Sequence, residues 1–416
     1  MLGSPRDDIT TQRGAGALAL LMIYWALIAP SSMLHYVGLK GLHSTALTIL
    51  LAFAIGLFTY RRIRPAFLLI FAIVVVLSMV NALNWNDFRY LFYWIFFTCA
   101  LFLVELSGKQ GVDRFCSMAT RLMLVLLMGA VFAFVLARVG LPPVLTITNP
   151  DGQDYYFFYT NFTNSYEDNV IRAAGIYDEP GAFSMYICFT AALRHLLERN
   201  RKITWLMLGL GFITFSLAHL VYVIFHFLAE QKSKKRLVAV FTFLVLCILA
   251  VVTSISADST VLLIRRLALT EDTNLFAGDN RSLQLLNAWS HIIDNPLVIL
   301  YGLDSTCVFN QTVCQEKFGP LGENPLSPLV FGGIASEGMF YVIIAVFLLS
   351  PFFGKRYLVL FGMALLFFQR PYVMGFSYTL LAVMLADIFL RRGQEMSESA
   401  PPPQLRNRGI HYRART

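Results

Sequence analysis

Long apolar runs separated by short polar connections repeat along most of the chain. Each run can cross roughly 30 Å of hydrocarbon, and backbone groups in lipid must be hydrogen-bonded within their own segment, so each run predicts a membrane helix. The alternating short segments of a closed β-barrel do not occur in the sequence. The predicted helices lie at 15–34, 42–60, 65–83, 88–106, 118–140, 180–197, 203–228, 237–256, 328–350, 357–370 and 372–390.

The run at 203–228 decides the topology. A single crossing would be about 39 Å long, and it would place 17 of the 33 Lys and Arg residues inside, which is no bias. If the run instead enters and returns as two short helices that break near Gly209, Gly211 and Ser216, 24 of the 33 lie inside, as the positive-inside rule requires. We therefore predict an all-α polytopic membrane protein with about 12 transmembrane helices, two of them short, and with both termini cytoplasmic.

This topology divides the chain into three parts. Residues 1–13 form a cytoplasmic N-terminus, 14–390 the polytopic domain, and 391–416 a disordered, Pro-rich and basic cytoplasmic tail. Two large periplasmic loops remain, at 141–179 and 257–327, and loops of this length are usually functional. Cys307 and Cys314 lie in the second loop, where they either close a small disulfide loop or stay as free thiols.

The composition agrees with a membrane protein and excludes several other classes. The chain is 57% hydrophobic and only 14% charged, with a mean hydropathy of +0.63, which a soluble globular domain does not show. A nucleic-acid binder and an extracellular disulfide scaffold are excluded as descriptions of the whole chain. The six cysteines show no Cys-x-x-Cys or Cys/His spacing that suggests a metal.

The first large loop ends in RAAGIYDEPGAFSMY, residues 172–186, and runs directly into a membrane helix. Glu179 precedes Pro180, which is typical of a helix start with a carboxylate near the positive end of the dipole. In one interpretation Arg172 binds a phosphate through its planar guanidinium, and Glu179 or Asp178 takes a proton from a sugar hydroxyl. In the other, Glu179 is only a cap and Arg172 is its ion-pair partner.

The second large loop combines arginines with an amphipathic stretch. Arg265 and Arg266 come first, and residues 280–296 then carry apolar side chains at helical spacing: Leu283, Leu286, Trp289 and Ile293. This predicts a helix lying against the membrane surface or the helix bundle. Arg281, in its first turn, would point toward a lipid-linked diphosphate or would only snorkel toward water. Trp289 fits an interfacial anchor better than a platform for sugar stacking.

Three places in the sequence resemble the O-antigen polymerase and O-antigen ligase family, the Wzy-type membrane glycosyltransferases. They are R-x-x-G-x-x-x-E-P-G at 172–181, the stretch from Arg281 through Trp289 and Asn295-Pro296 to Gly302, and Glu323-Asn324-Pro325 followed by Ser336-Glu337-Gly338. About a dozen helices with two large periplasmic loops extend the resemblance over most of the chain. Ligases of the family have a histidine where this sequence has Glu323, and the segment Phe368-Gln-Arg370-Pro371 looks closer to polymerases.

The resemblance implies glycan transfer at the periplasmic face of the bacterial inner membrane, from undecaprenyl-diphosphate-linked oligosaccharides and without a metal, cofactor or nucleotide sugar. It implies a flippase and a chain-length regulator as partners, and no nucleic acid. We expect polymerisation of repeat units for O-antigen, capsule or exopolysaccharide. The alternatives are an O-antigen ligase, a transporter that flips lipid-linked oligosaccharide, and a scaffold without activity; the concentration of charge in the outer loops favours chemistry at the surface over passage through the membrane.

The expected reaction is an inverting displacement, in which a sugar hydroxyl attacks the anomeric carbon of the growing chain and the lipid diphosphate leaves. Arg172 and Arg281 are the predicted stabilisers of the leaving diphosphate. Glu179 is the leading candidate for the general base, and Asp304 or Glu323 follow it. The predicted substrate-binding residues are Arg265, Arg266, Glu323, Asn324 and Arg370.

Overall fold

The computed structural model describes most of the chain outside three long segments. The described residues are 5–31, 65–87, 90–148, 154–167, 169–231, 281–304, 307, 311–322, 324–369 and 376–398. The predicted spans at 42–60 and 237–256, the end of the predicted tail, and the site residues Arg265, Arg266, Glu323 and Arg370 lie outside them.

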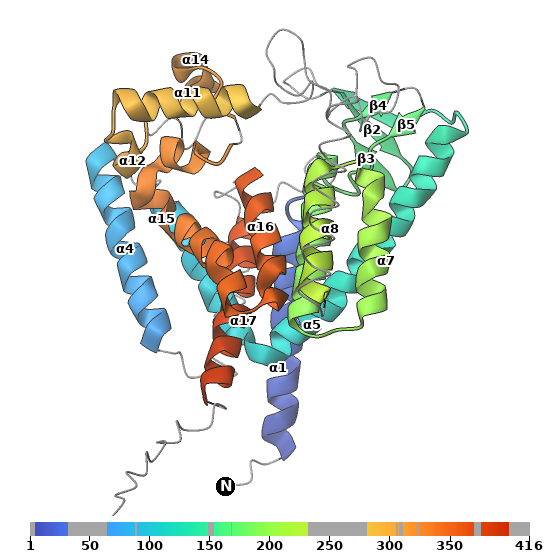
Figure 1. Ribbon diagram of the computed structural model, residues 1–416, viewed down its shortest axis with the longest axis horizontal. Coiled ribbons are helices and arrows are strands. Elements are labelled where there is room, and N and C mark those ends of the chain that lie inside the picture. Colours follow the sequence, from blue (N-terminus) through green and yellow to red (C-terminus); the bar gives the residue numbers. More distant parts are fainter. Residues whose placement is uncertain are drawn as a thin grey trace, which may run out of the picture.

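The described chain is mostly helical, as predicted, and Figure 1 shows most of the helices in one bundle, with α11 and α14 lying across one end. The long elements are α1 (Pro5–Ile23), continued by the π-helix η1 (Tyr24–Ile28), α4 (Pro65–Trp85), α5 (Tyr90–Arg138), α6 (Pro180–Leu196), α7 (Arg201–Gly211), α8 (Leu217–Glu230), α11 (Arg281–Asp294), α15 (Ser327–Leu349), α16 (Leu358–Gln369) and α17 (Phe376–Glu398). The short ones are η2 (Phe212–Thr214), α12 (Val298–Tyr301), α14 (Gln311–Phe318), η3 (Ser350–Phe353) and η4 (Lys355–Tyr357).

Two helices are long and apolar enough, by length and composition, to cross a membrane: Phe96–Arg138 and Ser327–Phe353, counted over the described residues. Large apolar side chains are also exposed along α4 and the second half of α5, among them Leu69, Val76, Leu83, Val125 and Phe132. Water does not stabilise such faces, whereas hydrocarbon does. The structure thus supports membrane association, and the number of spans stays a prediction.

The predicted break within 203–228 is confirmed. Helix α7 ends at Gly211, a short 3-10 turn follows, and α8 begins at Leu217. Phe215 adopts a left-handed conformation (φ 45°) that reverses the chain between them. The segment is therefore a hairpin of two short helices, both packed against α6.

The connection predicted between the spans at 88–106 and 118–140 differs from expectation. The element α5 consists of two helices that meet at a kink, at the non-helical Gly108 (φ 53°, ψ −165°). The turn is thus confined to the kink at Gly108, and residues 109–117 form the start of the second helix rather than a loop. Helix-forming residues such as Lys109, Gln110 and Arg114 favour this continuation once the chain has turned at Gly108.

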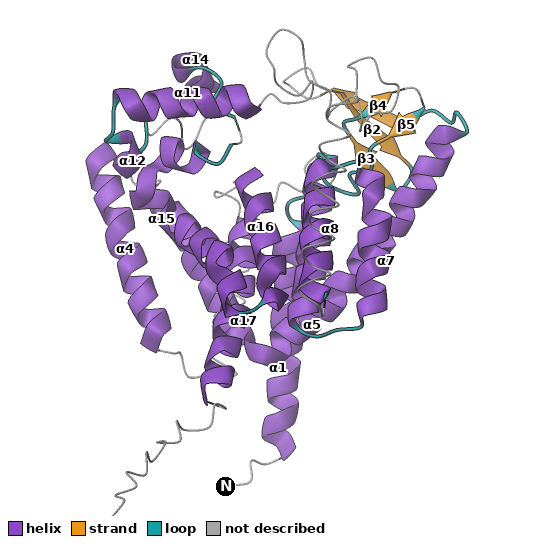
Figure 2. Cartoon of the chain, in the orientation of Figure 1, coloured by secondary structure: helices purple, strands orange, loops and turns teal. Residues whose placement is uncertain are grey.

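The first large loop contains strands that the all-α prediction did not include. β1 (Leu145–Thr148), β2 (Asp154–Phe158) and β3 (Asn161–Thr163) form an antiparallel sheet, and β4 (Tyr166–Glu167) pairs with β5 (Val170–Ile171). Aromatic residues, which favour strands, make up much of this segment. Figure 2 shows the strands together at one end of the helical bundle.

The described part of the second large loop forms a small core of its own over α15. Its buried residues are Ala288, Ile292, Val298, Cys307, Cys314, Leu321 and Val330. Cys307 and Cys314 are joined by a disulfide, with their Cα atoms 4.6 Å apart, so the bridged alternative is the correct one. The predicted helix at 280–296 is present as α11, and its apolar stripe faces outward, away from this core: Leu283, Leu286, Trp289 and Ile293 are all exposed.

Hydrogen bonds and ion pairs join separate segments of the chain at both ends of the bundle. At the end predicted to face outward, three hydrogen bonds join separate segments: Trp85 to Tyr301, Tyr177 to Leu27 and Ser31 to Ile176. At the opposite end, ion pairs join Arg199 to Asp113, Arg356 to Glu198 and Arg391 to Glu105. These contacts join separate segments of the described chain at each end of the bundle.

Candidate functional site

Arg172 lies where the first large loop meets the tip of the α7–α8 hairpin. It follows β5, its backbone N–H donates to Ser165 O at 3.1 Å, and its carbonyl accepts from Thr163 Oγ1 at 2.5 Å. One guanidinium nitrogen donates to Phe215 O at 3.3 Å, and the residue is only 8% exposed. A cation is therefore held nearly buried at the break between two short helices.

The predicted base lies at the start of α6. Glu179 is the N-cap residue, in an extended conformation, and its carboxylate makes no capping hydrogen bond. Its backbone N–H donates to Asp178 Oδ1 at 2.9 Å. Both carboxylates are half-buried beside the positive end of the helix dipole, which stabilises negative charge there.

Tyr177 anchors the segment that carries Asp178 and Glu179 to the helical bundle. Its hydroxyl donates to Leu27 O at 2.9 Å, its ring stacks on Tyr186, and the side chain is fully buried. Burial raises the pKa of Tyr177 well above its ordinary value, so the phenol remains a neutral donor. The carboxylates of Asp178 and Glu179 are thus presented from a rigid anchor.

Two further predicted residues, Arg281 and Asp304, lie in the described part of the second large loop. Arg281 is the first residue of α11. Asp304 pairs through Oδ2 with Lys317 Nζ at 2.6 Å, so a cation already occupies the carboxylate. A role for Asp304 as a base would require Lys317, which is half-exposed, to move aside.

Asn324 is completely buried and organises the turn before α15. Its side-chain amide donates to Leu321 O at 2.6 Å, and its side-chain oxygen accepts from Leu326 N at 2.9 Å. Ser327 closes the same turn by donating to Gly322 O. These bonds make Asn324 a positioning residue for the α15 start; its predicted contact with substrate stays a prediction.

Two of the three places that carry the family resemblance come together in space. The stretch ending at Gly302 packs on the first part of α15, where Leu303 N donates to Val330 O at 2.8 Å. Helix α15 is interrupted at Gly333, four residues before Glu337. The remaining place, residues 172–181, follows the strands at the same end of the molecule, and in the view of Figure 1 α16 lies between α12 and the strands.

A pocket below the α15 interruption contains a carboxyl group that the sequence analysis assigned no role. Its lining comes from α5, α15, α16 and α17: Phe97, Ser336, Glu337, Met339, Phe340, Ile343, Phe367, Tyr378, Thr379 and Ala382. Glu337 is 2% exposed. An ionisable residue within a membrane-type helix indicates function by default. The sequence indicated Glu337 through the apolar run around it and through the Ser336-Glu337-Gly338 stretch of the family resemblance.

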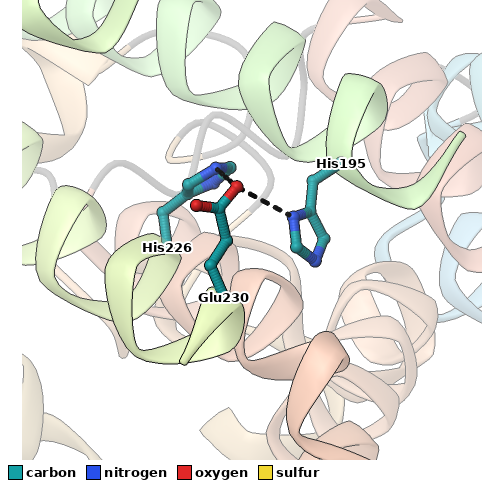
Figure 3. A group of neighbouring side chains, drawn as sticks. All are labelled: His195, His226 and Glu230. Atoms are coloured by element: carbon teal, nitrogen blue, oxygen red, sulfur yellow. Dashed lines mark ion pairs between the residues drawn. The ribbon is translucent and has the colours of Figure 1, made fainter. Parts of the chain in front are cut away.

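A second group of ionisable residues, at the opposite end of the bundle, was also missed (Figure 3). His195 lies in the last turn of α6, and His226 and Glu230 are one turn apart on α8. Their ligand atoms all lie within 4.8 Å of one another. The spacing His-x-x-x-Glu of His226 and Glu230 at the end of an apolar run was visible in the sequence. The third residue of the group, His195, precedes His226 by 31 residues, so the sequence did not connect it with them.

No family model, curated protein sequence or solved structure matches this chain. The geometry therefore has to support any functional conclusion by itself.

Proposed function

We propose that this chain is a membrane glycosyltransferase that polymerises undecaprenyl-diphosphate-linked oligosaccharide repeat units. The observation that carries the proposal is Arg172, a nearly buried guanidinium held at the α7–α8 break, with the carboxylates of Asp178 and Glu179 six and seven residues later in the same loop. A lipid-linked sugar diphosphate needs a cationic group for its phosphates and a base for the attacking hydroxyl. The first loop offers both at the entrance to the helical bundle.

In the proposed reaction, a hydroxyl oxygen of the acceptor repeat unit forms a bond to the anomeric carbon of the donor chain. The bond from that carbon to the diphosphate oxygen breaks, and undecaprenyl diphosphate leaves with the electron pair. Glu179 takes the hydroxyl proton, and Arg172 stabilises the charge that develops on the leaving group. A fixed guanidinium is effective here because its donors need no reorganisation during the reaction.

The proposal includes the finer topology. About 12 helices cross the bacterial inner membrane, both termini are cytoplasmic, and the loops at 141–179 and 257–327 face the periplasm. The outward-facing stripe of α11 supports this arrangement, because an amphipathic helix with exposed leucines is stable at a membrane surface. A flippase would supply the repeat units, and a chain-length regulator would set the polymer size.

The test compares Arg172→Ala and Arg172→Lys with Arg138→Ala, a matched control in which an exposed arginine near the same end is removed. Each variant replaces the only copy in the producing strain, and the polysaccharide and its lipid-linked precursors are sized by gel electrophoresis. We expect Arg172→Ala to lose long chains and accumulate single repeat units at normal protein abundance. Arg172→Lys keeps the charge without the planar fork and should recover only part of the chain length. Full-length polymer in Arg172→Ala would refute the assignment.

One observation favours a second candidate, a transporter that flips the same lipid-linked oligosaccharide. Glu337 lines a pocket between four helices, a placement typical of ionisable residues on a transport path. The two functions differ in where single repeat units accumulate after Glu337→Gln. A transporter would trap them on the cytoplasmic face, whereas a polymerase would leave them on the periplasmic face, accessible to an enzyme added to spheroplasts. A ligase would instead leave finished polymer on undecaprenyl diphosphate.

A further inference from the structure

We propose that His195, His226 and Glu230 form a binding site for a divalent transition-metal ion, with zinc as the expected occupant. The site lies at the end of the bundle opposite Arg172 and does not depend on the proposed glycosyl transfer. Its three side chains come from the ends of α6 and α8, so a bound ion would tie these two helices together.

The three ligand atoms already converge on one point. Glu230 Oε1 lies 3.7 Å from His226 Nε2 and 4.0 Å from His195 Nδ1. Zinc bonds of about 2.0–2.1 Å in a tetrahedral site place neighbouring ligand atoms about 3.3 Å apart. All three ligand atoms lie within 4.8 Å of one another, so closing the separations to that value requires each to shorten by about 1.5 Å or less, which side-chain rotations supply.

His226 provides the strongest indication that something is bound there. Its side chain is completely buried, and its Nε2 has no hydrogen-bond partner among the described residues. Buried polar atoms are almost always satisfied, and an exception requires an explanation such as an ion. Its other ring nitrogen, Nδ1, lies 3.3 Å from the Tyr222 hydroxyl. If Nδ1 carries the proton and donates it to Tyr222, the lone pair of Nε2 is directed toward the site.

The Oε2 atom of Glu230 is held by two neighbouring side chains, as metal-binding carboxylates usually are. Trp205 Nε1 donates to Oε2 at 2.7 Å, and Arg201 Nε pairs with the same oxygen. Oε1 therefore remains directed toward the histidines. Arg201 is 60% exposed and lies on the solvent side, so its charge is screened from the ion more than a buried cation would be.

The ligand set determines the class of ion. Two imidazoles and one carboxylate suit zinc, cobalt and nickel, and they bind magnesium and calcium poorly because those ions prefer all-oxygen sites. Three protein ligands leave a fourth position for water. Since this site joins the ends of α6 and α8, at the end of the bundle opposite Arg172, its expected contribution is stability.

The test uses the full-length protein in detergent, purified with a tag that contains no histidine, stripped with a chelator and reloaded with zinc. We expect about one equivalent of zinc in the wild type and less than about one tenth in His195→Gln and in Glu230→Gln. Glu230→Gln retains an acceptor for Trp205. Glu198→Gln and His291→Gln, which lie outside the site, should bind zinc like the wild type. Trp205→Phe should weaken binding by about 10–100-fold.

Cobalt gives a readout that does not depend on whether the variants fold. Cobalt in a tetrahedral site of nitrogen and oxygen ligands has intense visible absorption bands, and we expect them when the wild type is loaded with Co²⁺. The absence of these bands in the wild type would overturn the proposal, as would equal zinc retention in the wild type and Glu230→Gln. In that case the three residues form a network of ion pairs completed by Arg201.

Discussion

The close packing of α12 against the interrupted α15 rests on two glycines and predicts a severe response to single methyl groups. Gly302 (φ 81°, ψ −178°) and Gly333 (φ 66°, ψ 178°) both adopt conformations that are almost restricted to glycine. A Cβ at Gly333 would lie 2.4 Å from both the carbonyl carbon and oxygen of Leu300, and a Cβ at Gly302 would lie 2.4 Å from Phe331 O. All of these neighbours are backbone atoms, which cannot rotate away.

The expected loss of unfolding free energy in each alanine variant has two contributions. Conformational strain in this region of backbone space costs about 1–3 kcal/mol. Relieving the overlap requires the two backbones to separate by about 1 Å, and forcing extra volume into a packed region costs about 1–3 kcal/mol. We expect Gly302→Ala and Gly333→Ala each to destabilise the protein by about 3 kcal/mol. Once α12 and α15 have been forced apart, the second methyl group meets less resistance, so the double variant should fall short of the sum by about 1 kcal/mol or more.

The assay is reversible unfolding in mixed micelles, followed by near-ultraviolet circular dichroism for both single variants and the double variant. Gly209→Ala is the matched control, since this exposed glycine in α7 has ordinary helical geometry and no atom within 4 Å of an added Cβ. There the substitution should stabilise the protein by about 0.5–1 kcal/mol. Wild-type stability in Gly333→Ala, or strict additivity in the double variant, would contradict the close approach of α12 and α15.

Further predictions concern the buried polar residues. Arg194→Met should destabilise by about 2 kcal/mol because the guanidinium makes three hydrogen bonds, whereas Arg199→Met should cost less than about 1 kcal/mol because its ion pair is exposed; chemical unfolding measures both. Tyr177→Phe should cost about 1 kcal/mol in the same assay through the loss of one buried hydrogen bond, and equal stability would contradict its anchoring role. Reduction of the Cys307–Cys314 disulfide should speed proteolysis within the second loop and leave cleavage of the first loop unchanged, as mass spectrometry of the fragments would show.

The hairpin at 203–228 shows why some of the fold could be predicted from the sequence. The distribution of Lys and Arg favoured an even number of passes, and Gly209, Gly211 and Ser216 marked where a helix would break. The structure confirms the break within this stretch. Such predictions succeed because charged residues and helix-breaking residues act locally and can be located directly in the sequence.

The strands in 145–171 and the burial of Asn324 could not be predicted from the sequence. Both depend on packing that the local sequence pattern does not show. A long loop between two apolar runs fits many conformations, and the pairing of β2 with β3 is chosen by packing against α5. Asn324 follows a charged residue and precedes a proline, a pattern typical of an exposed turn. Its complete burial results from the folding of residues 321–327 around it.

The same reasoning explains why the two ends of the bundle were not equally predictable. At the loop end, the candidate residues follow one another along a single segment, so Arg172 and Glu179 could be proposed as one site from their order alone. At the opposite end, His195 and Glu230 meet only because α7 and α8 return the chain to the end of α6. A hairpin of two short helices brings its flanking residues within a few ångströms of each other, whatever their separation in sequence. Once such a hairpin is predicted, ionisable residues at its two outer ends should therefore be examined together as one candidate site.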